Sequence, residues 1–353
     1  LVYSSWRRYS KPLYESGEYD LFNDSEFDIS VVNIEENASR SPVNYVLPPG
    51  VDRVIDPNSQ SIKALNETAL SLKVVDLEDG NSKAVYKQFN KDLRQFGTIE
   101  MFVHAEELDD AAYNLEDGEL CAFIRVGSDF TENYYEYEVP LTLTSPGKYN
   151  KDSEFDRLLV WPEENMISLE LAVFKELKLE RDKMIADGII SDLQTYHVYS
   201  IAHGKNRVSI KGKPNIGNVR TIMIGVRNKK KTAKNPLDDG RKKSGIVWFN
   251  ELRLTDIDDQ SGWAAIASAR IALADFATLS VSGKTSKPGF GGIDQKVFER
   301  SQEDLYQYDV ASNIALNKFF PEAWSISLPF YVDFSEIYIM PQYDPTNPDI
   351  LLW

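Results

Sequence analysis

The most regular feature of this chain is the alternation of apolar and polar residues in its C-terminal part. Over residues 269–283 the odd positions are mainly aliphatic and the even ones small or polar, and the same alternation runs over residues 326–334. A weaker copy lies between them, over residues 309–317. Successive side chains of a strand point to opposite faces, so each segment predicts a strand with one apolar face. Strands of about ten residues with this period and aromatic ends are typical of an outer-membrane β-barrel wall.

The alternation assigns each strand residue to a face. The residues expected to face lipid are Ile271, Leu273, Leu279, Val281, Ile326, Leu328, Phe330 and Val332. The residues expected to face the lumen are Arg270, Ser280, Ser327 and Asp333. Asp275 falls on the apolar face, which predicts a bulge or a patch covered by a partner at that position. The alternative is a second soluble β-sandwich, whose strands alternate in the same way.

Upstream, residues 61–256 carry short alternating runs separated by turn-rich stretches, which predict a jelly-roll-like β-sandwich. The expected strands are residues 70–75, 99–104, 120–126, 135–139, 196–201, 207–210, 221–226 and 246–254. One amphipathic helix is expected near residues 164–184, because apolar residues from Met166 to Leu177 recur with a helical period and Gly188 is a plausible stop.

The two ends of the chain complete the predicted organisation. Residues 1–60 are aromatic-rich and turn-rich, and are expected to form an irregular arm that lies against a larger body. Residues 257–353 are expected to hold consecutive barrel-wall strands and loops, too few to close a barrel, so the chain reads as an internal fragment. The predicted fold is therefore mainly β: a jelly-roll-like sandwich with one inserted helix, then antiparallel strands of a large transmembrane β-barrel.

Composition and charge narrow the possible partners. The 353 residues are 42% hydrophobic and 27% charged, which is typical of a folded protein with room for two or three domains. Acidic residues outnumber basic ones by 55 to 39, and this excess argues against nucleic acid as the main partner. No apolar run approaches the about 20 residues of a transmembrane helix. The single Cys121 excludes an internal disulfide and is expected to be a buried, inert thiol.

No catalytic motif is present. His104, His197 and His203 fall on separate strands or loops without the spacing of a zinc site or a catalytic triad, so structural roles are expected. Nucleotide-binding and nucleophile-elbow motifs are absent from the sequence. The acidic stretches 76–81 and 256–259 have a structural calcium site as the functional alternative, but plain acidic turns are favoured. The sequence therefore predicts a protein that is not an enzyme, with no catalytic, cofactor-binding or metal site.

One basic run, residues 227–243, interrupts the acidic chain. It is expected to be a solvated loop between two strands. Its functional alternative is contact with lipid phosphates or with an acidic partner.

Three segments together carry a resemblance to a known family. They are residues 92–106 (DLRQFGTIEMFVHAE), residues 245–254 (GIVWFNELRL) running on to 262–265 (GWAA), and residues 340–350 (MPQYDPTNPDI). In this order, with a barrel-type strand directly after Trp263, the chain resembles the SprA/Sov family. Members of that family are very large outer-membrane translocons of the type IX secretion system of the Bacteroidetes, also required for gliding motility.

The resemblance covers nearly the whole chain, whereas the family proteins are several times longer. It implies a giant single-chain barrel in the outer membrane of a Gram-negative, Bacteroidetes-like cell, whose lumen passes folded cargo carrying a C-terminal secretion domain. It also implies a lateral opening, closed by a plug protein or by a small PorV-type barrel partner. The family has no catalytic residues to carry over to this chain.

A carbohydrate-binding sandwich is the alternative function, because the strand at residues 248–254 is common in jelly-roll modules of that class. Such a module needs a row of exposed aromatic residues, for which Tyr134, Tyr135 and Tyr137 are the candidates. A third hypothesis, an adhesin or assembly scaffold, shares the fold and differs only in its partner.

Overall fold

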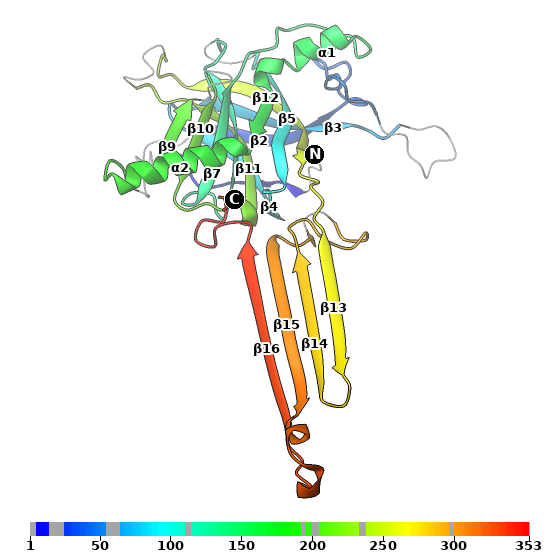
Figure 1. Ribbon diagram of the computed structural model, residues 1–353. Coiled ribbons are helices and arrows are strands. Elements are labelled where there is room, and N and C mark those ends of the chain that lie inside the picture. The colour runs from blue at the N-terminus through cyan, green and yellow to red at the C-terminus, as the bar shows by residue number, and fades with distance from the viewer. Residues whose placement is uncertain are drawn as a thin grey trace. The chain divides into compact units, whose positions relative to one another are not determined.

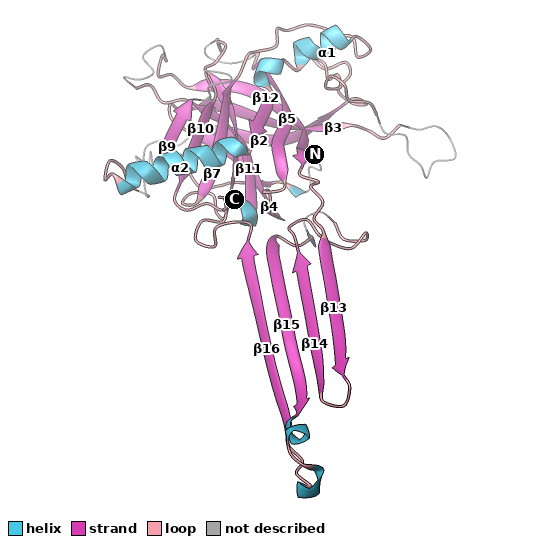
Figure 2. Ribbon diagram, in the orientation of Figure 1, coloured by secondary structure: helices cyan, strands magenta, loops and turns pink. Residues whose placement is uncertain are grey.

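The protein is mainly β, with three antiparallel sheets and two α-helices among the residues that the structure describes (Figures 1 and 2). This computed structural model describes residues 5–13, 25–53, 64–109, 114–191, 195–199, 205–232, 238–296 and 299–352. The chain divides into two compact units, Leu1–Ile257 and Asp258–Trp353.

Unit 1 contains two of the sheets. The first has seven strands in the order β1 (Arg7–Arg8), β4 (Ser82–Lys91), β11 (Val219–Asn228), β6 (Leu120–Gly127), β7 (Tyr134–Pro140), β10 (Arg207–Lys211), β9 (Tyr196–Tyr199). The second has five strands in the order β2 (Glu26–Asn33), β3 (Thr68–Leu77), β12 (Lys243–Ile257), β5 (Phe96–Glu107), β8 (Ile167–Glu170). Strands lie within these two sheets at all eight segments predicted from the alternation in this region.

The inner faces of the two sheets form one core. Leu72 and Phe249 from one sheet and Ile124 and Val208 from the other belong to the same buried cluster. The central strand β6 is buried along its whole length, since a smaller cluster around Leu13 covers its outer face. A strand covered on both faces reads as an apolar run rather than as an alternation, as LCAFI does here.

The outer face of the five-stranded sheet is covered near Trp248. This tryptophan packs with Tyr45 and Trp161 in a second buried cluster, and Trp161 follows directly after helix α1 (Glu154–Val160). The N-cap residue Ser153 accepts a hydrogen bond from the backbone N–H of Asp156 at 3.3 Å. Helix α1 was not predicted from the sequence, although a serine followed by an acidic residue three positions later is a helix-start signal.

The predicted helix at residues 164–184 is correct in kind but wrong at its start. Helix α2 spans Ala172–Ala186, whereas Ile167–Glu170 forms β8, which follows a short 3-10 turn. Ile167 and Leu169 are buried and their neighbours are exposed, the period of a strand that pairs with the edge of β5. Phe174 packs into the core as expected. Gly188, with φ at +72°, follows the end of the helix in the left-handed conformation that suits glycine.

The N-terminal segment, residues 1–60, is less irregular than predicted. β2 pairs with β3 over eight residues, and β1 pairs with β4. β2 is an edge strand in which exposed residues alternate with the buried Phe27 and the half-buried Ile29 over its first half, from Glu26 to Ser30. Aromatic and turn residues dominate the rest of the segment and obscured this pattern in the sequence.

β12 changes the side that it presents to the core within its length. Val247 and Phe249 belong to the core, and the register with β5 then shifts between Asn250 and Arg253. Glu251, with φ at +52°, is the residue at this irregularity. Beyond it, Leu252 and Leu254 pack against the core. A bulge of this kind bends a strand and reverses the odd–even order of its side chains.

Unit 2 is a four-stranded antiparallel meander. Its strands, in sheet order and in chain order, are β13 (Ala264–Leu273), β14 (Ala277–Ser286), β15 (Glu303–Ala315) and β16 (Pro329–Pro341). Two 3-10 turns, Leu316–Phe319 and Glu322–Trp324, separate β15 from β16. Over the described residues these strands form an open sheet and not a closed barrel. Neither helix of the described chain has the length and apolar composition needed to span a membrane.

Candidate functional site

The β13–β14 hairpin corrects one strand prediction and preserves its two faces. Residues 269–283 were expected to be a single strand, but the chain turns after Leu273 and returns as β14. Ala269 then lies opposite Val281, and Ile271 opposite Leu279. Paired residues of antiparallel strands share a face. The odd positions therefore stay on one side of the sheet even though the chain reverses.

Asp275 lies in the turn of this hairpin. Its side chain is exposed and forms an ion pair with Lys318, in the 3-10 turn after β15. The prediction of a bulge or of a partner-covered patch at Asp275 is therefore wrong. A carboxylate at a turn needs neither, because it is already outside the strand.

Three rows of paired residues run across all four strands on the apolar face. They are Leu273–Ala277–Ile314–Phe330, Ile271–Leu279–Ser312–Val332 and Ala269–Val281–Val310–Phe334. Ile271, Phe330 and Val332 each keep 47% of their surface exposed. Two-residue steps along a strand separate neighbouring rows by about 7 Å, so this apolar band extends along the strands.

The opposite face is polar over the same stretch. Its rows are Ala272–Thr278–Asn313–Tyr331, Arg270–Ser280–Ala311–Asp333 and Ser268–Ser282–Asp309–Ser335. Asp309 accepts hydrogen bonds at 3.2 Å from Ser282 Oγ and from Gln307 Nε2, and a further one from the Ser335 hydroxyl. The register thus brings Arg270, Ser280 and Asp333, three predicted lumen residues, into one row.

Aromatic residues stand at both ends of this sheet. At the end away from the β13–β14 turn, Tyr306 and Tyr338 are paired on the apolar face, and the Tyr338 hydroxyl donates to Glu336 at 2.6 Å. At the turn end, the rings of Phe276 and Phe319 meet edge-on with centroids 5.2 Å apart. Phe320 and Trp324 stack nearby in the chain, in the segment between β15 and β16.

Three predicted face residues lie outside the regular strands. Ile326, Ser327 and Leu328 precede Pro329, where β16 begins, so the expected strand at 326–334 starts later than predicted. The carbonyl of Leu328 still accepts a hydrogen bond from the N–H of Leu316 at 3.0 Å, next to the β15–β16 ladder. Strand alternation does not assign faces to these three residues, and their orientation stays a prediction.

The outer strands of the sheet each have one partner. Over the described part of the chain, β13 pairs only with β14, and β16 only with β15. The other edge of each carries a row of backbone N–H and C=O groups available to a further strand.

The basic run at residues 227–243 is not simply a solvated loop. Arg227, in β11, is buried and its guanidinium lies 2.7 Å from Glu136, in β7. Lys243, at the start of β12, is also buried and its ammonium lies 3.0 Å from Asp239. The expectation fails at both ends of the run because these residues belong to strands and pair with acidic neighbours.

Glu136 is the centre of this buried network. Arg125 lies 2.6 Å from one of its oxygens, and Arg227 contacts both oxygens. Burial alone would raise the pKa of Glu136, but the guanidinium groups of Arg125 and Arg227 outweigh it and lower the pKa below its ordinary value. The arrangement is an internal charge network of the sheet. Arg227 also pairs with Glu138, so both arginines that contact Glu136 have carboxylate partners within the protein.

The reactive side chains of unit 1 have structural surroundings. Cys121 is buried as predicted, and burial raises the pKa of its thiol to about 12. His104 is fully buried, with its ring stacked on Trp248 at a centroid distance of 3.9 Å and its Nδ1 2.8 Å from the carbonyl oxygen of Val160. The prediction for the side chain of His197 and for His203 falls outside the described residues.

The aromatic residues proposed for carbohydrate binding are not on the surface. Tyr134, Tyr135 and Tyr137 are 7%, 0% and 2% exposed. Tyr135 stacks on Phe174 of α2, with ring centroids 4.5 Å apart. This part of the alternative function is therefore wrong, because Tyr135 and Tyr137 belong to the core and Tyr134 is buried.

The acidic stretches have ordinary roles in the structure. At 76–81 the chain turns between β3 and β4, with Gly80 at φ +76° and a 3.0 Å hydrogen bond from Asn81 N–H to the carbonyl of Glu78. Asp256 lies in β12 and accepts a 2.7 Å hydrogen bond from Thr98 Oγ1. Over the described residues, no group of three His, Cys, Asp or Glu side chains could hold a metal ion.

One chain thus carries a two-sheet β-unit and a separate amphipathic antiparallel sheet. The chain belongs to the SprA N-terminal family, described as motility related/secretion protein, whose family model matches residues 1–353. This membership confirms the resemblance seen in the sequence. It implies bacterial secretion machinery and not an enzyme. A comparison with curated proteins finds no match.

Proposed function

We propose that β13–β16 form part of the wall of a large outer-membrane β-barrel. The face that carries Ile271, Leu279 and Val332 is turned toward lipid, and the face that carries Arg270, Ser280 and Asp333 toward the lumen. The observation that carries this proposal is the register: three successive rows of four paired residues are almost entirely apolar on one side and mainly small or polar on the other.

The dimensions of the sheet support the proposal. Its strands have ten to thirteen residues. At about 3.4 Å per residue, ten residues extend about 34 Å, enough for a tilted strand to cross an apolar band about 25 Å tall. Aromatic residues at both ends, such as Tyr338 and Phe276, suit the two interfaces, where barrels carry aromatic girdles.

The exposed apolar side chains argue against a solvated surface. Phe330, Val332 and Phe334 are each about half exposed on one strand, and no described element of unit 2 covers them. Contact of apolar surface with water costs about 25 cal/mol per Å², so a row of this kind needs an apolar environment. Lipid supplies one for the apolar face alone, in agreement with the polar character of the other face.

A wall of this kind must continue on both sides. In hydrocarbon an unpaired backbone N–H or C=O costs several kcal/mol, which is why strands cross membranes only in closed barrels. The outer edges of β13 and β16 therefore pair with further strands of the same barrel. The jelly-roll-like arrangement predicted for unit 1 is supported by its strand order, in which β3 to β6 alternate between the two sheets and β11 and β12 divide between them.

We further propose that this barrel is a protein-conducting channel that exports folded cargo with C-terminal secretion domains, as in type IX secretion and gliding motility. Its partners would be a small PorV-type outer-membrane barrel, a plug protein, secreted cargo and outer-membrane lipid. The support is family membership, together with the resemblance carried by residues 92–106, 245–254 and 340–350.

Extraction of the intact protein from outer membranes in mild detergent tests the channel proposal. Mass spectrometry then identifies the proteins that remain bound. The proposal predicts a very large barrel that retains a small barrel partner or a secreted cargo. An intact protein that is released without detergent contradicts the membrane assignment.

A further inference from the structure

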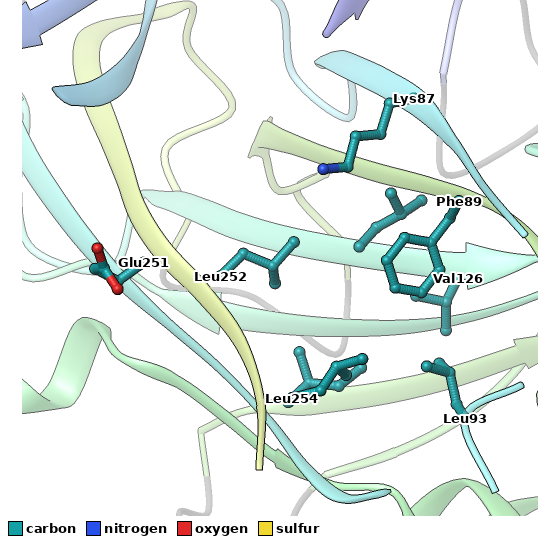
Figure 3. A pocket seen from close by; sticks show the side chains of 9 residues that line it. Lys87, Phe89, Leu93, Val126, Glu251, Leu252 and Leu254 are labelled. Carbon is teal, nitrogen blue, oxygen red and sulfur yellow. The ribbon is translucent and has the colours of Figure 1, made fainter. Parts of the chain in front are cut away.

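A cavity of about 330 Å³ lies between the two sheets of unit 1 (Figure 3). Its buried lining residues are Leu93, Ile99, Val126 and Ile222. Its half-buried lining residues are Lys87, Phe89, Glu251, Leu252 and Leu254. Seven of these nine residues are apolar. This volume is at the lower end of the range for ligand pockets, which are mostly apolar with a few placed polar groups.

The bulge in β12 shapes one wall of this cavity. Because the register shifts at Glu251, Leu252 and Leu254 turn toward the space between the sheets. In Figure 3 they lie across the cavity from Lys87 and Phe89, which come from β4. The cavity therefore depends on a local irregularity of one strand.

Lys87 is the unusual lining residue. It alternates with Val85 and Phe89 on the inner face of β4, and its neighbours across the sheet are Ile222 and then Val126. Its ammonium group lies 4.9 Å from the centroid of the Trp6 ring, and burial lowers the pKa of Lys87. Over the described residues no carboxylate pairs with this ammonium group. Lys87 is only half-buried, and a carboxylate bound in the cavity would be the counter-ion that its ammonium group lacks among the described residues.

The other polar groups near the cavity do not offer that counter-ion. Glu251 lines the cavity, but its carboxylate accepts hydrogen bonds from the guanidinium of Arg253 at 2.8 and 2.9 Å. Trp6 is buried, and its Nε1–H has no hydrogen-bond partner among the described residues. The site thus combines an apolar body with one unmatched positive charge on its rim.

We propose that this cavity binds an unbranched aliphatic chain of about ten carbons that ends in a carboxylate. The carboxylate accepts hydrogen bonds from Lys87 Nζ, and the chain packs among Ile222, Leu252 and Leu254. The number of carbons follows from the cavity volume of about 330 Å³, if each carbon of the chain is taken as a water-sized group of about 30 Å³. Charge complementarity selects the head group, and the apolar lining selects the chain. This inference does not depend on the membrane proposal for unit 2.

A photoreactive fatty acid tests the site directly. The intact protein is exposed to a ten-carbon carboxylic acid that carries a diazirine near its methyl end, and cross-linked peptides are identified by mass spectrometry. The proposal predicts labelling of peptides that contain Leu93, Val126 or Ile222. It also predicts competition by decanoate and much weaker competition by decyltrimethylammonium, which has the same chain and the opposite charge.

Two substitutions separate the head group from the chain. Lys87→Met keeps the length of the side chain and removes its charge, so the decanoate concentration for half-competition should rise about tenfold. Lys83→Met, on the same face of β4 but outside the cavity, is the matched control and should leave the decanoate concentration for half-competition unchanged. Leu254→Trp fills the cavity at its half-buried edge and should abolish the labelling. Near-ultraviolet circular dichroism verifies that each variant is folded.

Three results would overturn the proposal. The first is labelling of the wild-type chain confined to peptides outside the cavity, which needs no variant to interpret. The second is equal competition by decanoate and decyltrimethylammonium, which would leave the charge of Lys87 without a role. The third is displacement of the probe by a short peptide with a C-terminal leucine carboxylate but not by decanoate, which would assign the cavity to a protein partner.

Discussion

Ile271 and Leu279 lie directly opposite each other across the β13–β14 hairpin, on the face that also carries Val332. Paired residues share a face, and the pairing continues through Ser312 to Val332, so one apolar face extends from β13 to β16. A charged residue introduced at one of two adjacent strand positions should therefore affect folding differently from one introduced at the other.

Leu279→Arg and Thr278→Arg make this comparison in β14. An arginine on the lipid face costs about 2–4 kcal/mol at the midplane and less toward the interfaces, whereas one on the lumen face has water to solvate it. Thr278 lies directly opposite Ala272 and Asn313, neither of which is charged. Leu279→Arg should reduce the heat-modifiable, folded fraction in outer membranes far more than Thr278→Arg. Equal folded fractions for the two variants would contradict the face assignment.

Glu136→Gln should destabilise unit 1 in a pH-dependent manner. The loss of one partner of a buried ion pair costs about 3–5 kcal/mol. The pKa of Glu136 is lowered from its ordinary 4.5, so its contribution is complete above that pH and declines as the pH falls below it. Urea unfolding followed by tryptophan fluorescence should show a smaller difference between wild type and Glu136→Gln at pH 3 than at pH 7.

The matched control is Glu132→Gln, which removes an exposed carboxylate 3.3 Å from Lys211. Exposed ion pairs contribute little, so this variant should stay within about 0.5 kcal/mol of wild type at both pH values. A difference for Glu136→Gln that is the same at pH 3 and pH 7 would show that the lowered pKa has no part in stability.

The thiol of Cys121 should be unreactive in the folded protein. Burial raises its pKa to about 12, so almost no thiolate is present at pH 8, and the side chain has no exposed surface. Reaction with a thiol-specific disulfide reagent should be negligible in buffer and complete in urea. Rapid modification of the folded chain would contradict the packing of β6 against β11.

Gly225→Ala should destabilise unit 1 by about 1–3 kcal/mol, the usual cost of overpacking a core. A Cβ atom at this position would lie 2.5 Å from the carbonyl oxygen of Lys83 and 2.7 Å from the ring of Phe123. Gly147→Ala is the control, because its nearest neighbour would be 3.7 Å away. The midpoint of urea unfolding should fall for the first variant only. Equal midpoints would show that the sheet relaxes around an extra methyl group.

The sandwich strands could be predicted from the sequence because their residue patterns fit few structures other than a strand. The segments at β6 and β12 are too short and too rich in β-branched and aromatic residues for a helix, and turn residues bound most of them. Residues 166–169 were ambiguous, since Met166 and Leu169 fit a helix as well as a strand. These residues form a strand because they pair with the open edge of β5, and a sequence pattern does not show such an edge.

The faces of unit 2 were more predictable than its turns. The tip at Asp275 has neither glycine nor proline, so the alternation appeared to continue through it. The buried network of Glu136 and Arg227 was not predictable in this way, because charged residues in a strand normally indicate a solvated face. Only the segments that cover the outer face of that sheet make it internal. The cavity beside Lys87 likewise depends on a bulge that the sequence does not signal.

The most direct test of the central claim is an accessibility scan of β16 with nitroxide labels at residues 330–334. The low reactivity expected of Cys121 allows single cysteines to be labelled in the folded chain. For a barrel wall, labels at 330, 332 and 334 should collide mainly with oxygen dissolved in lipid, and labels at 331 and 333 with a water-soluble nickel complex. Uniform access of the nickel complex to all five positions would contradict the proposal that this sheet is part of a barrel wall in the membrane.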